Sequence, residues 1–561
     1  MDNETTDRTR RRPRPSLAGA ALPVVAALAT ACWLALHRWY GLPEHADHTH
    51  FAFEKVPGGF RSSILQNTLW LFAAVSALYA VGFAVLARAG RLSRWAKLGA
   101  LGAMVGPGLV NLWLYPVGAL DVFNYMIELK LAFHFDENPY LTTFAAYRAD
   151  PFALPAFLVD VKLFYGPAWL LATGIPALVA GFDDVLRLLL AIKAFNLLLL
   201  GAIAALIFRA QRDQRRGWLA AYALVANPLV LFEGVANAHN DVLMTLFLVA
   251  AVIAARDGRW LTGPALAAGA LVKFFVLPLA PLLAVAHLRT RGGRRALLPA
   301  TLGGAIVVVG LVAPFWAGGA MWDGLKEGTT ESQAMNHVSP FSLTQQLWRQ
   351  ERAQAVPEGS AFRQMEQRWE WERPFPEDDL ALLRQRFGIA FAAVVALLAL
   401  AVWRGFALER ALVVAYLAFA LLLTNLYAWY LIPAFALLAL RLDRLGAAFM
   451  WIQTGLGLAY YPVYVWARYQ SGYDELEIHL FLARFLTVPI VVYLAIETTR
   501  PTLGRIARFA LGRWRRRWPD TSDAPPLTRG LDERGRGGEG WASGGEPPHR
   551  GGGARTVELP R

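Results

Sequence analysis

The sequence predicts an all-α fold: a polytopic membrane protein with about 12 to 14 transmembrane helices, juxtamembrane helices and an extracytoplasmic loop subdomain. The first observation is composition: of 561 residues, 56% are hydrophobic and 17% charged, with a mean hydropathy of +0.36. Soluble domains contain about 45 to 50% apolar residues, so a soluble enzyme and a disordered chain are excluded. The second observation is a series of long apolar runs separated by arginine-rich loops. Cys32 is the single cysteine, which excludes a disulfide scaffold.

Eight of the apolar runs approach the ~20 residues that a helix needs to cross ~30 Å of hydrocarbon. They are residues 17–36, 64–87, 98–118, 185–208, 296–318, 386–403, 446–466 and 476–497. Six shorter runs suit crossing, re-entrant or protein-buried helices equally, and are residues 217–232, 242–255, 260–272, 274–288, 409–424 and 427–440. We expect the first run to be an uncleaved anchor because it exceeds the usual signal-peptide core. The alternative is cleavage after the triplet at 29–31.

Arginine-rich loops set the expected orientation. They are residues 88–97, 209–216, 289–295 and 441–444, and all should be cytoplasmic. A crossing at residues 166–181 would put the second of these loops on the wrong side. We therefore expect residues 166–181 to form an amphipathic helix on the outer surface. Both termini then lie in the cytoplasm, and the polar segments between spans gather on the extracytoplasmic face of the membrane.

The predicted organisation has five parts. An N-terminal cytoplasmic segment with two accessory spans covers residues 1–96, and a membrane module with most of the polar motifs covers 97–318. An extracytoplasmic loop subdomain (319–385), C-terminal transmembrane helices (386–500) and a basic, disordered cytoplasmic tail (501–561) follow. Basic residues beside the last span predict contact with anionic membrane lipids and no nucleic acid partner.

The first polar motif, LDVFNYMIELKLAFHFDENPY, directly follows the third apolar run. Its candidate site residues are Asp121, Asn124, Tyr125, Lys130, Asn138 and Tyr140. A carboxylate where an apolar wall meets water suits proton abstraction from a hydroxyl group. The alternative is that Asp121 caps the following helix, since Asp favours that position.

The second motif, VANPLVLFEGVANAHNDVLM, crowds polar side chains into a turn between two short apolar runs. Its candidate site residues are Asn237, His239, Asn240 and Asp241. Such side chains are costly at membrane depth unless they face protein or a wet cavity, which favours a functional site. The alternative is a hydrogen-bonded turn that caps the next helix. No second spaced His or Cys pair accompanies His239, so we expect no metal site and no cofactor, with a divalent metal as the less favoured alternative.

The third motif is Lys273 in ALVKFFVLPLAP, where no acidic neighbour accompanies the ammonium group and we expect it to be unpaired. It either snorkels to an interface or neutralises a phosphate at the membrane surface. Two further signals are Tyr165, which opens a Tyr-Gly-Pro sequence before the juxtamembrane helix, and the aromatic residues at 427–430. We expect those aromatic residues to form an interfacial belt.

Taken in order, these motifs resemble the glycosyltransferase C superfamily. The resemblance is closest to its polyprenyl-phosphate-mannose-dependent mannosyltransferases, which include bacterial α-mannosyltransferases and the first GPI-anchor mannosyltransferase. It rests on Asp121 with Tyr125 four residues later, the Asn-Pro-Tyr at 138–140, the Tyr-Gly-Pro at 165–167, the turn at 227–241, and Lys273 before a proline-containing helix. It covers about residues 97–290.

The resemblance implies an inverting transfer of a hexose, expected to be mannose, from a polyprenyl-phosphate-linked sugar to a glycan or glycolipid acceptor. Asp121 matches the position of the family's base. Lys273 and His239 would stabilise the departing phosphate. The other substrate-binding residues would be Asn124, Tyr125, Lys130, Asn138, Tyr140, Tyr165, Asn237, Asn240 and Asp241. Val122 follows Asp121, so the Asp-x-Asp pair of metal-dependent superfamily members is absent from this position.

The main rival is a transporter or a lipid or glycan flippase. Transporters place ionisable residues near the membrane midplane and often contain repeated halves. Here the polar motifs are expected at one face and the sequence shows no evident repeat. The sequence therefore favours a transferase, and it leaves open a glucosyltransferase, an arabinosyltransferase or a glycan ligase of the same superfamily.

Overall fold

The computed structural model describes residues 17–42, 61–331, 338–354 and 377–517. The chain divides into two units, Met1–Thr499 and Arg500–Arg561, and the following description concerns the first. Its first half contains α1 (Leu17–Tyr40), α2 (Ser62–Arg88), α3 (Arg94–Leu112), α4 (Asp121–Phe133), η2 (Phe144–Tyr147), η3 (Pro151–Ala153), α5 (Pro167–Ala180), α6 (Val185–Ala210), α7 (Gln214–Val225), α8 (Pro228–Leu231), η4 (Phe232–Ala236), α9 (Asp241–Arg256) and α10 (Thr262–Ala270).

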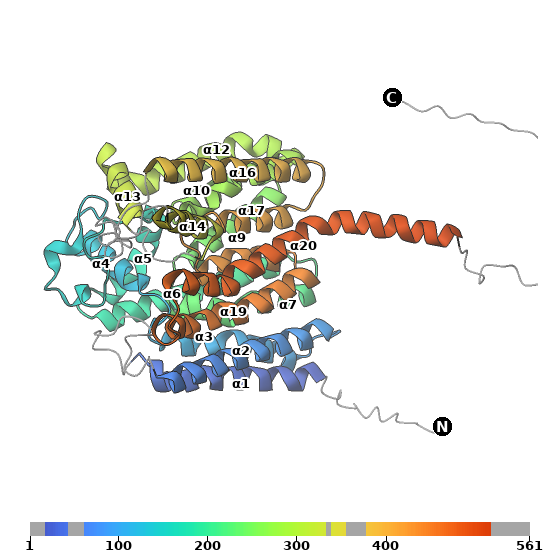
Figure 1. Cartoon of the computed structure of the whole chain (residues 1–561), viewed down its shortest axis with the longest axis horizontal. Helices are drawn as coiled ribbons and strands as arrows, with labels where there is room; N and C mark the ends of the chain where they lie inside the picture. Colours follow the sequence, from blue (N-terminus) through green and yellow to red (C-terminus); the bar gives the residue numbers. More distant parts are fainter. Residues whose placement is uncertain (1–16, 43–60, 332–337, 355–376, 518–561) are drawn as a thin grey trace, which may run out of the picture. The chain divides into compact units, whose positions relative to one another are not determined.

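The second half continues with helices only. They are η5 (Phe274–Leu279), α11 (Ala280–Arg289), α12 (Arg291–Val312), η6 (Ala313–Phe315), α13 (Gly319–Glu331), α14 (Pro340–Gln354), α16 (Glu377–Trp403), α17 (Leu408–Ala420), η7 (Ala428–Tyr430), α18 (Leu431–Leu440), α19 (Arg444–Tyr469) and α20 (Glu475–Arg517). The long helices lie side by side (Figure 1). The expected all-α polytopic class is confirmed.

Six of the described helices are long and apolar enough to cross a membrane: α1, α2, α6, α12, α16 and α20. A seventh span forms if α7 and the following segment to Ala236 are taken together, although they are bent by 55°. Pro228 causes the bend because it lacks an N–H group and disfavours the helical conformation at Asn227. The other apolar runs form α3, α19 and shorter helices, so the count of 12 to 14 crossings stays a prediction.

The first helix is an integral part of the bundle. It packs along α3 and α2, and Leu22, Trp33 and Leu36 on its inner face are almost fully buried. At the crossing with α3, a Cβ atom on Gly99 would lie 2.5 Å from the backbone nitrogen of Pro23, so the two helices approach as closely as their backbones allow. The uncleaved anchor stays a prediction.

The four arginine-rich loops lie together at one end of the bundle. Hydrogen bonds from side chains to carbonyl groups connect them to one another and to the α16–α17 turn: Arg215 to Ala87, Gln211 to Leu440 (3.2 Å) and Arg289 to Val402. Glu409 lies between Arg256 and Arg441, at 3.4 and 4.0 Å. The four loops therefore lie on the same side of the bundle, as the sequence predicted.

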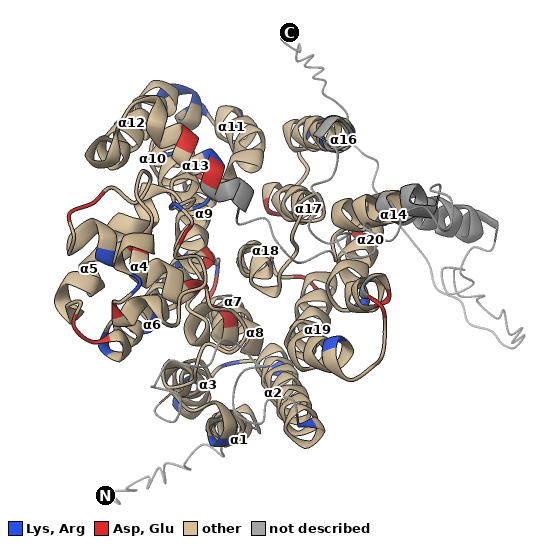
Figure 2. Cartoon of the chain, turned by 60° about the vertical axis from the view of Figure 1, so that its left-hand side comes forward, with Lys and Arg blue, Asp and Glu red and all other residues tan. Residues whose placement is uncertain are grey.

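The opposite end carries α4, α5 and α13, which are grouped at the left of Figure 1. Helix α5 has 14 residues and is about 21 Å long at ~1.5 Å per residue, which is too short to cross ~30 Å of hydrocarbon. It leads into α6, whose far end reaches the arginine-rich loops. A location of residues 166–181 on the outer surface of the membrane stays a prediction. Charged residues gather between α4, α9 and α13 on a ribbon that is otherwise mostly uncharged (Figure 2).

Two predictions for the loop and the tail need comment. The loop at 319–385 forms helices α13 and α14, and its central residues, 355–376, lie outside the described residues. The tail was expected to be disordered from residue 501, which is wrong for its beginning. Helix α20 continues through Arg517, and the remaining residues, 518–561, lie outside the described residues.

Candidate active site

A cavity of about 680 Å³ lies at the end of the bundle that carries α4 and α13. Its walls come from the start of α4, the segment 157–167, the C-terminal parts of α10 and α12, helix α13, and residues 423–430. Most of the lining is aliphatic or aromatic. Among the described residues that line it, Asp121 and Lys273 are the two that carry a charge at neutral pH. Segments far apart in the sequence therefore enclose one carboxylate and one ammonium group.

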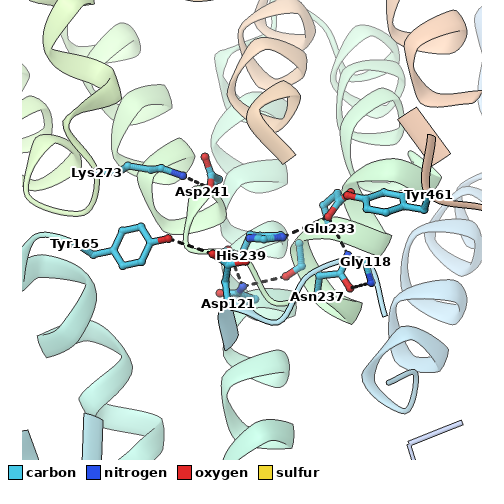
Figure 3. Close-up of polar contacts among 11 residues, drawn as sticks. Gly118, Asp121, Tyr165, Glu233, Asn237, His239, Asp241, Lys273 and Tyr461 are labelled. Carbon is cyan, nitrogen blue, oxygen red and sulfur yellow. Dashed lines mark hydrogen bonds and ion pairs between the residues drawn. The ribbon is translucent and has the colours of Figure 1, made fainter. Parts of the chain in front are cut away.

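Asp121 is the first residue of α4, and Leu120 occupies the cap position. The Asp121 carboxylate accepts a hydrogen bond of 3.3 Å from the Tyr165 hydroxyl group (Figure 3). Burial raises the pKa of Tyr165 well above its usual value, so this hydroxyl remains a proton donor. Because Asp121 is not in the cap position and faces the cavity, the structure favours the site interpretation over the capping alternative.

Gly166 explains why a Tyr-Gly-Pro sequence occurs beside the site. A Cβ atom on Gly166 would lie 1.9 Å from the carbonyl oxygen of Leu271, at the end of α10. The backbone N–H of Gly166 donates to the Val272 carbonyl at 3.2 Å. Only glycine permits this approach, which holds Tyr165 next to Lys273 at the mouth of the cavity.

The inner face of α4 is almost completely buried. Tyr125 lies one turn after Asp121, edge-on to the ring of Tyr165 at 5.3 Å. Glu128 follows it on the same face, and one of its carboxyl oxygens is buried without a hydrogen-bond partner among the described residues. Burial raises the pKa of Glu128 well above its usual value, and the charge of Asp121 raises it further. These two effects favour the neutral form of Glu128.

Lys273 is not the unpaired cation that the sequence predicted. It is 8% exposed, and its Nζ lies 2.9 Å from Oδ2 of Asp241, the first residue of α9. The rings of Phe275 and Tyr430 face the same ammonium group, at 4.7 and 4.6 Å. A buried, paired lysine cannot be one that snorkels to water. The expectation failed because Asp241 is 32 residues away in the sequence and is brought to Lys273 by the fold.

The turn between η4 and α9 is held by a buried polar network. Glu233 accepts hydrogen bonds from the Tyr461 hydroxyl group and from Nδ2 of Asn237 (2.9 Å), and its Oε2 lies 3.4 Å from Nε2 of His239. Oδ1 of Asn237 accepts from the backbone N–H of Gly118 at 3.1 Å (Figure 3). Asn237 is therefore a structural link to the segment before Asp121 rather than a free side chain.

His239 lies face to face with Trp429, with ring centroids 4.0 Å apart, and Trp429 stacks on Tyr427 at 4.1 Å. The preceding Ala238 has a positive φ of 56°, a conformation that is strained for a residue other than glycine. Strain of this kind is typical of sites where function fixes the backbone.

The structure brings some of the other predicted residues to the site and gives the rest structural contacts. Asn240 is fully buried with both polar side-chain atoms unpartnered among the described residues, as is Oδ1 of Asp241. Neither residue is among those that line the cavity. Tyr140 lines the cavity and donates to the Tyr165 carbonyl at 2.8 Å. By contrast, Asn124 accepts from two backbone N–H groups of the segment at 157–158.

Two predicted substrate-binding residues lie away from the cavity. Lys130 forms an ion pair of 2.7 Å with Asp150 and lies over the ring of Phe152. Asn138 accepts from the backbone N–H of Tyr140 and donates to the Phe315 carbonyl, which fixes the loop after α4. Their positions fit roles in holding α4 and its loop. In the described part of the chain, no three His, Cys, Asp or Glu side chains gather as metal ligands would.

The residues that the sequence interpretation missed are aromatic. Tyr427, Trp429 and Tyr430 were expected in an interfacial belt, but all three line the cavity, where Trp429 and Tyr430 are buried and Tyr427 is partly exposed. The signal that could have placed them was their position, in a turn predicted to lie on the same face as Asp121. Tyr461 gave no such signal, since it lies inside an apolar helix.

A family model described as the N-terminal domain of alpha-(1→6)-mannopyranosyltransferases matches residues 58–289. Residues 58–289 are thus similar to a mannosyltransferase domain. The matched region begins just before α2, which had been assigned as accessory, and ends with α11, so it contains Asp121, the turn at 227–241 and Lys273. The resemblance to glycosyltransferase C mannosyltransferases is confirmed, and it favours a transferase over a transporter. No curated protein and no solved structure matches the chain.

Proposed function

We propose that this mannosyltransferase takes mannose from a polyprenyl-phosphate-linked donor and transfers it to a glycan or glycolipid at the outer face of a bacterial plasma membrane. The observation that carries the proposal is that Asp121 and Lys273 both line one largely apolar cavity. The reaction needs a base for the acceptor hydroxyl and a cation for the leaving phosphate. An apolar wall beside both suits a lipid donor.

The proposed reaction is a single displacement with inversion. The acceptor oxygen attacks the anomeric carbon while its proton passes to the Asp121 carboxylate, and the bond between that carbon and the phosphate oxygen breaks. The electron pair leaves with the lipid phosphate, whose added charge the Lys273 ammonium group stabilises. Inversion that yields the α-(1→6) linkage in the family's name requires a β-linked donor.

The lipid part of the donor is proposed from the walls of the cavity. Leu266 and Ala270 of α10 and Val308 and Val312 of α12 line it, and none of these side chains can hydrogen-bond. Leu277, on the neighbouring η5, is 51% exposed at the surface of the bundle. An isoprenoid chain entering here would gain about 0.8 kcal/mol for each buried CH₂ group.

The test is transfer of labelled mannose by the purified full-length chain. Donors would be mannosyl-phosphate-polyprenol and a nucleotide-linked mannose, each with mannose-terminated glycans and glycolipids as acceptors. We expect product from the lipid donor, with an inverted α-linkage by NMR. Transfer from the nucleotide donor alone would overturn the proposed donor. Movement of the lipid-linked sugar across vesicle membranes without formation of a glycosidic bond would overturn the proposed reaction.

A further inference from the structure

Glu233 is a buried carboxyl group that the proposed reaction does not use. It is 0% exposed and lies in η4, a single turn of π-helix inside the bent apolar segment. Turns of this kind are uncommon and occur often at functional sites. Within the described part of the chain, the basic side chain within 4 Å of its carboxyl group is that of His239, which burial keeps from being a charged partner. Burying a carboxyl group without a lysine or arginine partner lowers the stability of the fold, so its retention here indicates a functional role for its contacts.

The contacts of Glu233 point in two directions. On one side, the Tyr461 hydroxyl group donates to Oε1 and attaches the carboxyl group to α19. On the other side, Oε2 receives Nδ2 of Asn237 at 2.9 Å and lies 3.4 Å from Nε2 of His239. Figure 3 shows Glu233 between Tyr461 and His239. One carboxyl group thus connects a distant helix with two residues of the strained turn.

We infer that Glu233 is a positioning residue for mannosyl transfer, which sets both the imidazole of His239 and the backbone that carries Asp121. The inference rests on the proposed function, with Asp121 as base. Nε2 of His239 makes no regular hydrogen bond among the described residues, and the Glu233 carboxyl oxygen 3.4 Å away favours a proton on that nitrogen rather than on Nδ1. Stacking on Trp429 at 4.0 Å fixes the plane of the same ring. The orientation of His239 is therefore specified from two sides.

The second effect passes through Asn237. Its Nδ2 is held by Glu233, so its Oδ1 is directed at the backbone N–H of Gly118, three residues before Asp121. A Cβ atom on Gly118 would lie 2.5 Å from Nδ2 of Asn237 and 2.8 Å from the ring of Phe232, so this close approach requires glycine. The chain of contacts from Glu233 to Gly118 fixes where α4 begins. It thereby fixes the depth of the Asp121 carboxylate in the cavity.

The test compares Glu233→Gln with a matched control. Glutamine keeps the size and can accept from Tyr461, but it is uncharged and presents an N–H group to Asn237 or His239. We expect kcat to fall by about 10- to 100-fold, as for a displaced reacting group, while KM for the lipid donor changes by less than about threefold. The control is Thr454→Val, which removes a buried hydrogen bond of 2.7 Å that Asn227, the cap residue of α8 just before η4, donates to α19 away from the cavity.

If the role of Glu233 is purely structural, kcat should fall in proportion to thermal stability. Glu233→Gln and Thr454→Val would then lose the same kcat whenever they lose the same stability. That result, or an unchanged kcat in Glu233→Gln, would overturn the inference. If Glu233→Gln does not fold, Tyr461→Phe serves instead, because it keeps the Glu233 carboxyl group and removes the hydrogen bond that attaches it to α19. It should lower kcat less, again without raising KM, and an unchanged kcat would overturn the inference equally.

The two proposals fail separately. If Asp121→Asn is inactive while Glu233→Gln is fully active, the positioning role of Glu233 is refuted and Asp121 stays the proposed base. Both variants fully active would remove the proposed base and the positioning role together.

Discussion

The proposed reaction depends on Asp121, and the contacts of this residue allow its role as a base to be separated from a structural role. Asp121→Asn keeps the shape of the side chain and can still accept from Tyr165, but it cannot take a proton from the acceptor. Turnover should therefore fall by roughly 10²- to 10⁴-fold. Turnover would be measured together with thermal stability in detergent and binding of the donor lipid. Activity within about threefold of the parent, under ~1 kcal/mol in barrier, would refute the assignment of the base.

A matched control for Asp121 exists at the same end of the bundle. Asp184 caps α6, and its carboxylate accepts from the backbone N–H of Arg187 at 3.1 Å. Asp184→Asn removes the same charge from an exposed helix start outside the cavity. Because Asn is about as good a cap as Asp, this variant should keep both stability and turnover.

The Lys273–Asp241 pair changes what a lysine substitution should do. Lys273→Met leaves the fully buried Asp241 without its cation, so we expect a loss of stability of about 3 to 5 kcal/mol as well as poorer use of the donor. The double variant Lys273→Met with Asp241→Asn should recover most of the stability. It should not recover donor use, because the phosphate still lacks its cation. Thermal unfolding and kcat/KM for the lipid donor measure the two effects separately.

If the double variant recovers both stability and donor use, Lys273 has only a structural role.

The Lys273–Asp241 pair also shows what a sequence can and cannot predict at the scale of single residues. Lys273 and Asp241 each stood out because charge is rare in apolar runs. Their partnership was not predictable, since it depends on how α9 and η5 pack.

Among the secondary-structure elements, α5 offers the clearest prediction. Gly166→Ala places a Cβ atom 1.9 Å from the Leu271 carbonyl oxygen, so the start of α5 must move away from α10. We expect a loss of stability of about 1 to 3 kcal/mol and a loss of turnover, because Tyr165 moves with it. Differential scanning fluorimetry and the transfer assay provide the two measurements.

The control for Gly166 is Gly201, which lies in α6 and has nothing within 4 Å of the corresponding Cβ position. Gly201→Ala should leave turnover unchanged and raise stability by up to about 1 kcal/mol through helix propensity. If Gly166→Ala behaves like Gly201→Ala, the close approach does not hold Tyr165 in place.

The elements themselves were largely predictable, and their irregularities were not. Each apolar run became a helix or a broken helix, because an apolar stretch without water must satisfy its own backbone hydrogen bonds. Asn227-Pro228 signalled a break, yet nothing in the sequence indicated the turn of π-helix at Phe232–Ala236. The helix α13 over the cavity was also unexpected, since its segment was predicted only as part of a folded loop. These features depend on packing against distant helices.

The orientation of the whole molecule is testable by labelling. In a Cys32→Ser background, cysteines at Asp160 and Asp183 lie on the two sides of α5, and both positions are exposed. Because α5 should not cross the membrane, an impermeant reagent should label both in intact cells. A cysteine at Arg212, at the arginine-rich end, should be labelled only after permeabilisation. Labelling of position 183 only after permeabilisation would contradict the topology.

At the scale of the molecule, composition was sufficient for the class and insufficient for the site. Hydropathy and arginine distribution predicted an all-α membrane protein with its polar motifs at one end, and the loops with Ala87, Gln211 and Leu440 do lie together. The cavity could not be predicted, because its walls come from segments as far apart as residues 121 and 430. Contacts at that separation leave no pattern in a single sequence.

The partly exposed wall of the cavity has a practical consequence for handling the protein. Phe274 and Leu277 line the cavity and are about half-exposed, so the apolar space can be reached from the surrounding amphiphile phase. Detergent tails are chemically close to the proposed isoprenoid chain and would compete for that space in a micelle. We therefore expect apparent donor affinity to rise when the protein is moved from detergent into lipid nanodiscs. Single-chain amphiphiles with a small anionic head group would then be the natural starting point for inhibitors.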